Sequence, residues 1–464
     1  MNRAHNRPWF GLLTIGLGAS IAPMDFAVNV AFPAITAAFT LDMQAIRWVV
    51  ICYVITYASL MLAFGKLGDL IGHRAVFRAG LIASTLAFAA CGLAPTYAWL
   101  LAARALQGIA IALVLSCAPA LIVAACGEQR RTWALSRYTM TAAVAGIVGP
   151  LAGGVAIQLM GWAGVFWFRL PVALLALLLL ARLPAVESPA HSTRHVDIVS
   201  SALLAAGLAL VLLAPALWLD AAYAVWPLAI GMTGALLLIR FARRERGHAE
   251  PILPAAALRN SGVRLSNLTS VTINLVGFAI PLLVPFYLAR IGGFSAAAMG
   301  LLLALATVGV LASSTLAPRV VRAMGQRWSM LLGVALVALA QLVMAFWPMA
   351  PTMPMLAPGL ILHGLGIGLF QVSYADFIVA TLRARDRGIA GSLTVLTRTL
   401  GVIAAAVILT STLQALEARH LAGGLAAREA FHAAFSTVFL SSGLLLAAFV
   451  AFSAFRGSQS NSSL

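Results

Sequence analysis

Long apolar stretches alternate with short polar segments along the whole chain. The stretches are about 20 residues long, which is the length of helix that crosses a bilayer core, and they are continuously apolar rather than alternating as barrel strands do. The pattern therefore predicts an all-α integral membrane protein with fourteen transmembrane helices. The expected spans are residues 9–35, 45–64, 77–94, 98–125, 138–158, 164–181, 198–218, 224–239, 265–289, 297–317, 328–347, 355–379, 389–413 and 434–455.

The composition agrees with this prediction and limits the classes of function that the chain can have. Of the 464 residues, 62% are hydrophobic and only 9% are charged, against roughly 25% charged residues in a soluble domain. Fourteen helices would use about 280 residues, so the loops are too short for a soluble catalytic domain. The sequence also lacks a metal-ligand cluster, a phosphate loop and a nucleophile motif in suitable context. We therefore expect neither an enzyme nor a bound metal or cofactor.

The basic residues follow the predicted topology. Of the 30 Lys and Arg residues, 23 fall on the side that holds both termini and four on the other side, while Arg104, Arg169 and Arg398 lie within spans. By the positive-inside rule, this asymmetry predicts a multi-pass protein of the bacterial inner membrane with its N- and C-termini in the cytoplasm. The net charge of +17 then reflects topology, and we expect no nucleic-acid partner.

The most polar cytoplasmic stretches, 182–197 and 240–264, bracket the seventh and eighth spans. Removing that pair leaves six spans on each side, the pattern of transporters built from two six-helix halves. The predicted organisation is an N-terminal half at 1–182, linker segments with an inserted helix pair at 183–260, and a C-terminal half at 261–464. A faint internal repeat agrees, because 65–74 and 318–327 both place a glycine and basic residues at the same turn.

The segment 65–74 resembles the signature loop of the major facilitator superfamily, in which a tight turn and a charge network hold the inner gate shut. The matching positions are Gly65, Asp69, Gly72 and Arg74. The resemblance implies a gating role for this loop, with Asp69 near helix ends and basic residues. The alternative interpretation is a solvated cytoplasmic loop.

Further stretches resemble the fourteen-span drug:proton antiporters of that superfamily, the EmrB/QacA type. Residues 24–33 of the first span carry Asp25 and Asn29, and residues 104–108 of the fourth span carry Arg104 and Gln107. Residues 146–154 of the fifth span resemble the antiporter motif, and 287–300 and 388–401 also match family positions. The resemblance thus covers nearly the whole chain.

The resemblance implies proton-coupled efflux of hydrophobic drugs or toxic compounds. The implied partners are a small lipophilic substrate, protons and membrane lipids, with a monomeric transport unit. A periplasmic adaptor and an outer-membrane channel are optional further partners. An exporter of a lipid or lipophilic metabolite is an alternative within transport. A non-transporting membrane sensor is the alternative from another class, since fold alone does not fix function.

Small residues form a stripe along the fifth span. They are spaced at offsets of 0, 3, 4, 7 and 8 and so share one helix face: Gly146, Gly149, Pro150, Gly153 and Gly154. Such a face permits close helix contact and a kink at the proline. The spacing by itself favours plain helix packing, whereas the family resemblance favours a role in exchange.

Ionisable residues within spans are the sharpest functional candidates, because charge at the bilayer centre costs at least about 2.5 kcal/mol. Asp25, Arg104 and Arg169 are all expected in the periplasmic third of their spans. We predict that Asp25 and Arg104 couple proton movement. Burial favours the neutral carboxyl and a neighbouring arginine favours the carboxylate, so the pair would have to form in one conformation and separate in the other.

The remaining polar residues in spans have less specific predictions. With Asn29 and Gln107, we assign Arg169 and Arg398 to the substrate pathway. For Arg169, snorkelling to the near interface is the favoured alternative, whereas Arg398 is near the midplane, where pairing inside the bundle is favoured. His363 is expected to form an interhelical hydrogen bond.

The charge balance within the spans predicts which substrates are exported. Asp25 is the one deeply placed carboxylate among three arginines, so neutral, monocationic or anionic lipophiles should be exported better than dications. Efflux measured in cells for matched monovalent and divalent analogues tests this expectation. Efficient efflux of a dication would contradict it.

Overall fold

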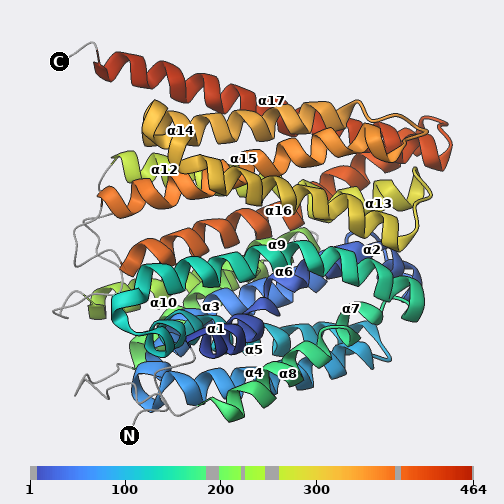
Figure 1. Cartoon of the computed structure of the whole chain (residues 1–464). Coiled ribbons are helices and arrows are strands. Elements are labelled where there is room, and N and C mark those ends of the chain that lie inside the picture. Colours follow the sequence, from blue (N-terminus) through green and yellow to red (C-terminus); the bar gives the residue numbers. More distant parts are fainter. Residues whose placement is uncertain (1–7, 184–197, 221–224, 246–260, 382–387, 462–464) are drawn as a thin grey trace, which may run out of the picture. The chain divides into compact units, whose positions relative to one another are not determined.

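The computed structural model describes residues 8–183, 198–220, 225–245, 261–381 and 388–461, and within these ranges it contains helices and no strand (Figure 1). The described residues form two compact units. The first takes the described parts of Met1–Leu41 and Trp48–Ala249, and the second takes Asp42–Arg47 and the described parts of Glu250–Leu464.

The first unit holds several helices that break within a predicted span. The first span is a long helix interrupted by a 3₁₀ turn, and the sixth is a short helix followed by a longer one. The helices of this unit are α1 (Pro8–Ser20), η1 (Pro23–Phe26), α2 (Ala27–Ala38), α3 (Arg47–Ile71), α4 (His73–Gly92), α5 (Tyr97–Cys126), η2 (Glu128–Arg130), α6 (Arg131–Met160), α7 (Gly164–Trp167), α8 (Leu170–Arg182), α9 (Ile198–Asp220) and α10 (Trp226–Glu245).

The second unit repeats much of this order. Its first predicted span is again broken, here between α12 and α13, and Figure 1 shows α14 and α15 side by side. Its core joins buried side chains of α12, α14, α15 and α17, among them Val276, Val334 and Phe370. The helices of this unit are α12 (Ser261–Gly277), α13 (Ala279–Arg290), α14 (Ala296–Ala345), α15 (Met353–Thr381), α16 (Gly388–Ala422) and α17 (Ala427–Asn461).

Helical structure covers most of every predicted span, but fewer helices are long and apolar enough to cross a membrane. Ten of those described meet that requirement, and eleven do so if the bent pair Arg47–Met61 and Ala63–Ile71 is one span. This count takes α14 as one helix, although its backbone leaves helical geometry at Gly325. The apolar stretch Ala202–Pro215 of α9 is shorter. The protein is therefore a multi-pass helical membrane protein, and a total of fourteen spans stays a prediction.

The helices α9 and α10, which the sequence predicts as an inserted pair, pack closely against each other. A Cβ on Gly234 would lie 2.8 Å from the backbone nitrogen of Val211, and one on Gly207 would lie 2.8 Å from Leu238. Such contacts require small residues at the interface. The predicted domain limits near 183 and 260 lie at or within ranges outside the described residues, so those boundaries remain predictions.

The predicted gating segment is mostly helix rather than loop. Gly65 and Asp69 lie within α3, and the chain turns at Gly72, whose φ is +93°. The repeat segment has the same device, since Gly325 has a φ of +80°. A backbone with these angles is nearly restricted to glycine. The expectation of a loop over 65–74 is therefore wrong, because one glycine suffices to reverse the chain.

In both repeats, the arginine two residues after this glycine fixes the turn to another helix of its own unit. The Arg74 Nη2 atom donates to the Leu180 carbonyl of α8 at 2.8 Å. The Arg327 Nη2 atom donates to the Ser453 carbonyl of α17 at 2.7 Å. Hydrogen bonds from a charged donor are the stronger kind. The faint sequence repeat thus corresponds to a shared turn with a shared anchor.

We expect the turn glycines to be sensitive to substitution. Gly72→Ala and Gly325→Ala should each lower the free energy of unfolding by about 1–3 kcal/mol, because alanine is strained at these backbone angles. Gly65→Ala is the matched control, since Gly65 is helical and has open space at its Cβ position. It should be neutral or stabilising by up to about 1 kcal/mol. Thermal unfolding in detergent measures all three, and equal losses would contradict the prediction.

Candidate functional site

Asp25 occupies a break in the first predicted span. Residues Pro23–Phe26 form the 3₁₀ turn η1 between α1 and α2, and the proline stands at the start of that turn. Proline cannot donate the backbone hydrogen bond that a continuous helix needs. The break places the carboxylate between the two helical parts, where side chains of α5 and the α7–α8 corner reach it.

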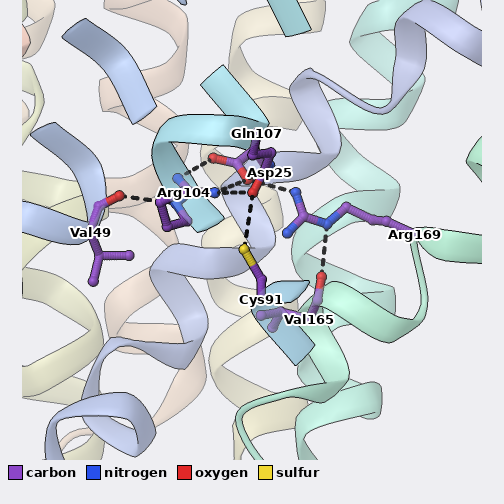
Figure 2. Close-up of polar contacts among 7 residues, drawn as sticks. All are labelled: Asp25, Val49, Cys91, Arg104, Gln107, Val165 and Arg169. Carbon is purple, nitrogen blue, oxygen red and sulfur yellow. Dashed lines mark hydrogen bonds and ion pairs between the residues drawn. The ribbon is translucent and has the colours of Figure 1, made fainter. Parts of the chain in front are cut away.

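The carboxylate accepts hydrogen bonds from three side chains (Figure 2). Arg104 donates twice, from Nη1 to Asp25 Oδ1 at 2.8 Å and from Nη2 to Oδ2 at 2.9 Å. Gln107 Nε2 donates to Oδ1 at 2.9 Å, and Arg169 Nη1 donates to the same oxygen at 2.6 Å. A two-point contact between arginine and carboxylate is geometrically the most specific kind of ion pair.

Arg104 is held by the helices around it. The residue is 1% exposed, and its Nε donates to the Val49 carbonyl of α3 at 3.0 Å. Its Nη1 also donates to Gln107 Oε1 at 2.7 Å, and its guanidinium carbon lies 4.4 Å from the centre of the Tyr53 ring. These contacts fix the guanidinium in place and partly offset its loss of water.

Arg169 is more deeply enclosed. It is 0% exposed and its Nε donates to the Val165 carbonyl at 2.7 Å. The Phe88 and Phe166 rings lie 4.7 and 5.3 Å from its guanidinium carbon. The expectation that Arg169 snorkels to the interface is therefore wrong. Its position in the chain places it at the same depth as Asp25, and the corner between α7 and α8 turns it inward.

The other expected pathway residues are not part of this cluster. Asn29 is mostly buried in α2 and forms no hydrogen bond with other described residues. Arg398 lies on α16 of the second unit, is exposed, and has no ion pair within the part of the chain that the structure describes. The expected pairing of Arg398 inside the bundle is thus wrong, because its position on α16 leaves it outside the helix contact that buries its neighbour Thr397.

His363 also differs from expectation. Its ring is buried in α15 beside Gly277, at the break between α12 and α13, but its Nδ1 has no hydrogen-bond partner among the described residues. The expected interhelical hydrogen bond to this atom is therefore not formed.

The small-residue stripe of α6 supports the turn that carries Asp25. All five members of the stripe are buried. A Cβ on Gly149 would lie 2.9 Å from the backbone of Met24, and one on Gly153 would lie 2.5 Å from the Cβ of Ala27. The stripe thus contacts the residues on either side of Asp25, and its lack of side chains lets the turn approach α6. The structure thus shows close packing of the stripe against the turn, and a role in exchange stays a prediction.

The predicted gating residues contact other partners than the Asp25 cluster. The Asp69 carboxylate is 3.2 Å from the Nε2 of His73, one helical turn further along the chain. Its side chain is 64% exposed. The structure thus places Asp69 in the last turn of α3, where its exposed carboxylate is accessible to other charged groups.

The arrangement can hold a charge but shows no metal site. No group of three or more His, Cys, Asp or Glu side chains suited to a metal ion occurs among the described residues. The four cysteines are free and lie in or at the ends of helices. One carboxylate between two enclosed guanidiniums can be ionised or protonated, and it can exchange hydrogen-bond partners.

The chain matches known membrane transporters along most of its length. The sequence pattern of the Major Facilitator Superfamily matches residues 9–406. The uncharacterised transporter Rv1250 of Mycobacterium tuberculosis is 31% identical over 292 residues, which is 62% of this chain. The chain spans only half the length of that relative, since the match covers 50% of it.

Two relatives match over more of their length. The cephamycin export protein CmcT of Amycolatopsis lactamdurans is 31% identical, covering 83% of this chain and 81% of its own. The multidrug resistance protein Stp of Mycobacterium tuberculosis is 27% identical, covering 87% and 75%. The solved structure of tetrameric PepTSo2 has a TM-score of 0.72 at 13% identity and covers 98% of this chain and 99% of its own, which shows a shared fold.

We expect bulk in the stripe to disable the Asp25 site before it prevents folding. Gly153→Leu should lower turnover about tenfold or more, because overpacking of about 1–3 kcal/mol would push the turn away from α6. Val155→Leu is the control on the same helix, since Val155 is exposed. Membrane insertion and transport are measured together for both variants. Normal transport by Gly153→Leu would show that the contact with Ala27 is unimportant.

Proposed function

Because the chain belongs to the Major Facilitator Superfamily, we propose that it exports hydrophobic compounds across the bacterial inner membrane in exchange for protons. The names of CmcT, a cephamycin export protein, and of Stp, a multidrug resistance protein, support export of antibiotic-like compounds. The proposal includes fourteen spans of the EmrB/QacA type, both termini in the cytoplasm, and a monomeric transport unit. A periplasmic adaptor with an outer-membrane channel would be an additional partner.

The observation that carries the proposal is the Asp25 carboxylate, held by Arg104 through two hydrogen bonds and by Arg169 through one. Both arginines are enclosed by protein. In a site that excludes water, the carboxylate stays ionised only while a guanidinium contacts it. Separation of Asp25 from its arginines would therefore drive uptake of a proton, and renewed contact would drive its release.

This proton exchange becomes transport if the contacts change with the conformation. In the proposed cycle, Asp25 takes up a proton while it is accessible from the periplasm and apart from Arg104. When the opposite side opens, Arg104 contacts Asp25 again and the proton leaves toward the cytoplasm. The two protonation states thus favour different conformations, which is the requirement for coupling.

The neighbouring elements have separate roles in this proposal. The α6 stripe, through Gly149 and Gly153, sets the position of the Asp25 turn. Gln107, Asn29 and Arg398 would contact substrate, while Asp69 and Arg74 would hold the inner gate. An exporter of a lipid or lipophilic metabolite would use the same cluster with a different substrate, and a sensor would bind without transport.

Substitution of Asp25 separates proton coupling from substrate binding. Asp25→Asn should abolish uphill efflux in proteoliposomes with an imposed pH gradient, yet leave substrate binding or downhill exchange. Arg104→Ala should slow turnover at neutral pH, because only Arg169 then favours the ionised carboxylate and Asp25 releases its proton less readily. The control is Asp42→Asn, which removes an exposed carboxylate. Uphill transport by Asp25→Asn at a normal rate and with unchanged pH dependence would refute the scheme.

A further inference from the structure

The Asp25 cluster has more positive than negative charge. One carboxylate faces two guanidiniums, so the cluster has a formal net charge of +1 when Asp25 is ionised. Arg104 and Arg169 are 1% and 0% exposed, so water does little to stabilise this excess. An enclosed charge without a counter-ion is strongly unfavourable. Asp25 is therefore the single counter-ion that these two enclosed guanidiniums have among the described residues.

One hydrogen-bond donor of the cluster is also unused. Arg169 employs Nε and Nη1, but its Nη2 is buried and has no hydrogen-bond partner in the described part of the chain. Figure 2 shows that both terminal nitrogens of Arg169 are turned toward the Asp25 side of the guanidinium. An enclosed guanidinium nitrogen without a partner is rare in folded proteins. It is a position suited to an acceptor.

Among the described residues that face the cluster, the surrounding helices supply no second acid. The polar and aromatic side chains that face it are Tyr53 from α3, Phe88 and Cys91 from α4, Arg104 and Gln107 from α5, and Phe166 from α7. The α6 helix contributes glycines. Aromatic faces attract a guanidinium but do not neutralise it. When Asp25 is protonated, no other acid among the described residues that face the cluster can take its place, so a replacement negative charge must come from outside them.

We propose that the cluster binds a monovalent anion, either chloride or the carboxylate of an anionic lipophile, which takes the place of the Asp25 carboxylate between Arg104 and Arg169. The exchange occurs when Asp25 is protonated, because the two guanidiniums would otherwise lose their single counter-ion. The anion then keeps the formal charge at +1 in both protonation states. This inference rests on the proposed function in one respect, that Asp25 is the residue that exchanges protons.

Asp25 is the most accessible of the three charged side chains of the cluster. The Asp25 side chain is 13% exposed, whereas those of Arg104 and Arg169 are 2% and 0% exposed. Of the three charged side chains, that of Asp25 is thus the one with appreciable accessible surface. A neutral Asp25 side chain that turns away from the arginines uncovers their donors at that same point. The acceptor that replaces it must be compact and singly charged.

Proton and anion binding should therefore assist each other. By linkage, an anion that binds only the protonated form takes up one proton, and its affinity rises by up to about tenfold for each unit by which the pH falls. Asp25→Asn removes the competing carboxylate without adding bulk. This variant should bind the anion tightly at every pH. Arg169→Gln should bind it weakly or not at all.

The experiment uses the purified full-length protein in detergent with gluconate as the only starting anion. Chloride and benzoate are titrated separately at pH 5.5, 6.5 and 7.5 while the thermal unfolding midpoint is followed. Proton uptake is recorded in weak buffer. Asp42→Asn serves as the charge-matched control for Asp25→Asn. No gradient or substrate transport is involved, so failure of anion binding and failure of proton-coupled efflux are separate results.

We expect a rise in the unfolding midpoint that strengthens at low pH in the unmodified protein, becomes independent of pH in Asp25→Asn and disappears in Arg169→Gln. A response to chloride identifies an inorganic counter-ion, and a response to benzoate alone identifies a substrate carboxylate. If Arg169→Gln does not fold, the difference in pH dependence between the unmodified protein and Asp25→Asn still tests the proposal. No response to either anion, or an equal response at all pH values in the unmodified protein, overturns the proposal.

Discussion

The first unit depends on the contact between one carboxylate and two arginines that are almost completely removed from water. Asp25, Arg104 and Arg169 come from η1, α5 and the corner between α7 and α8, so their contact joins segments that are far apart in the sequence. Each charge would be costly alone in a membrane protein interior. Mutual contact offsets that cost, and the break at Pro23 and the glycines of α6 are the features that make it possible.

The two units share a framework but differ at this position. Both turn at a glycine with positive φ and anchor the turn through an arginine two residues later. Both also break their first span. In the second unit the break lies at Gly277, which has no side chain, and it faces His363 and Gln341, whose Nε2 donates to the Val276 carbonyl. Among the described residues, the cluster of one carboxylate and two enclosed arginines thus lies in the first unit.

The helices and their membrane character followed from the sequence, because apolar length and the distribution of arginine are local properties of the chain. The repeat between 65–74 and 318–327 was also visible, since both segments need a glycine at the turn. The secondary structure of these segments was not visible in the sequence. Gly65 and Asp69 belong to a helix, because one glycine at position 72 is enough to reverse the chain. A total of fourteen spans likewise depends on how broken or marginal helices such as α14 and α9 are placed.

For the candidate site, the sequence by itself determined which residues carry charge in apolar surroundings and at what depth, and so identified Asp25 and Arg104. Only the tertiary structure decided which of these charges meet. It turned Arg169 inward to Asp25 and left Arg398 exposed on α16. Depth follows from counting residues along a helix, whereas direction depends on how that helix rotates and bends against its neighbours. That rotation is set by packing among helices distant in sequence, which no local pattern records.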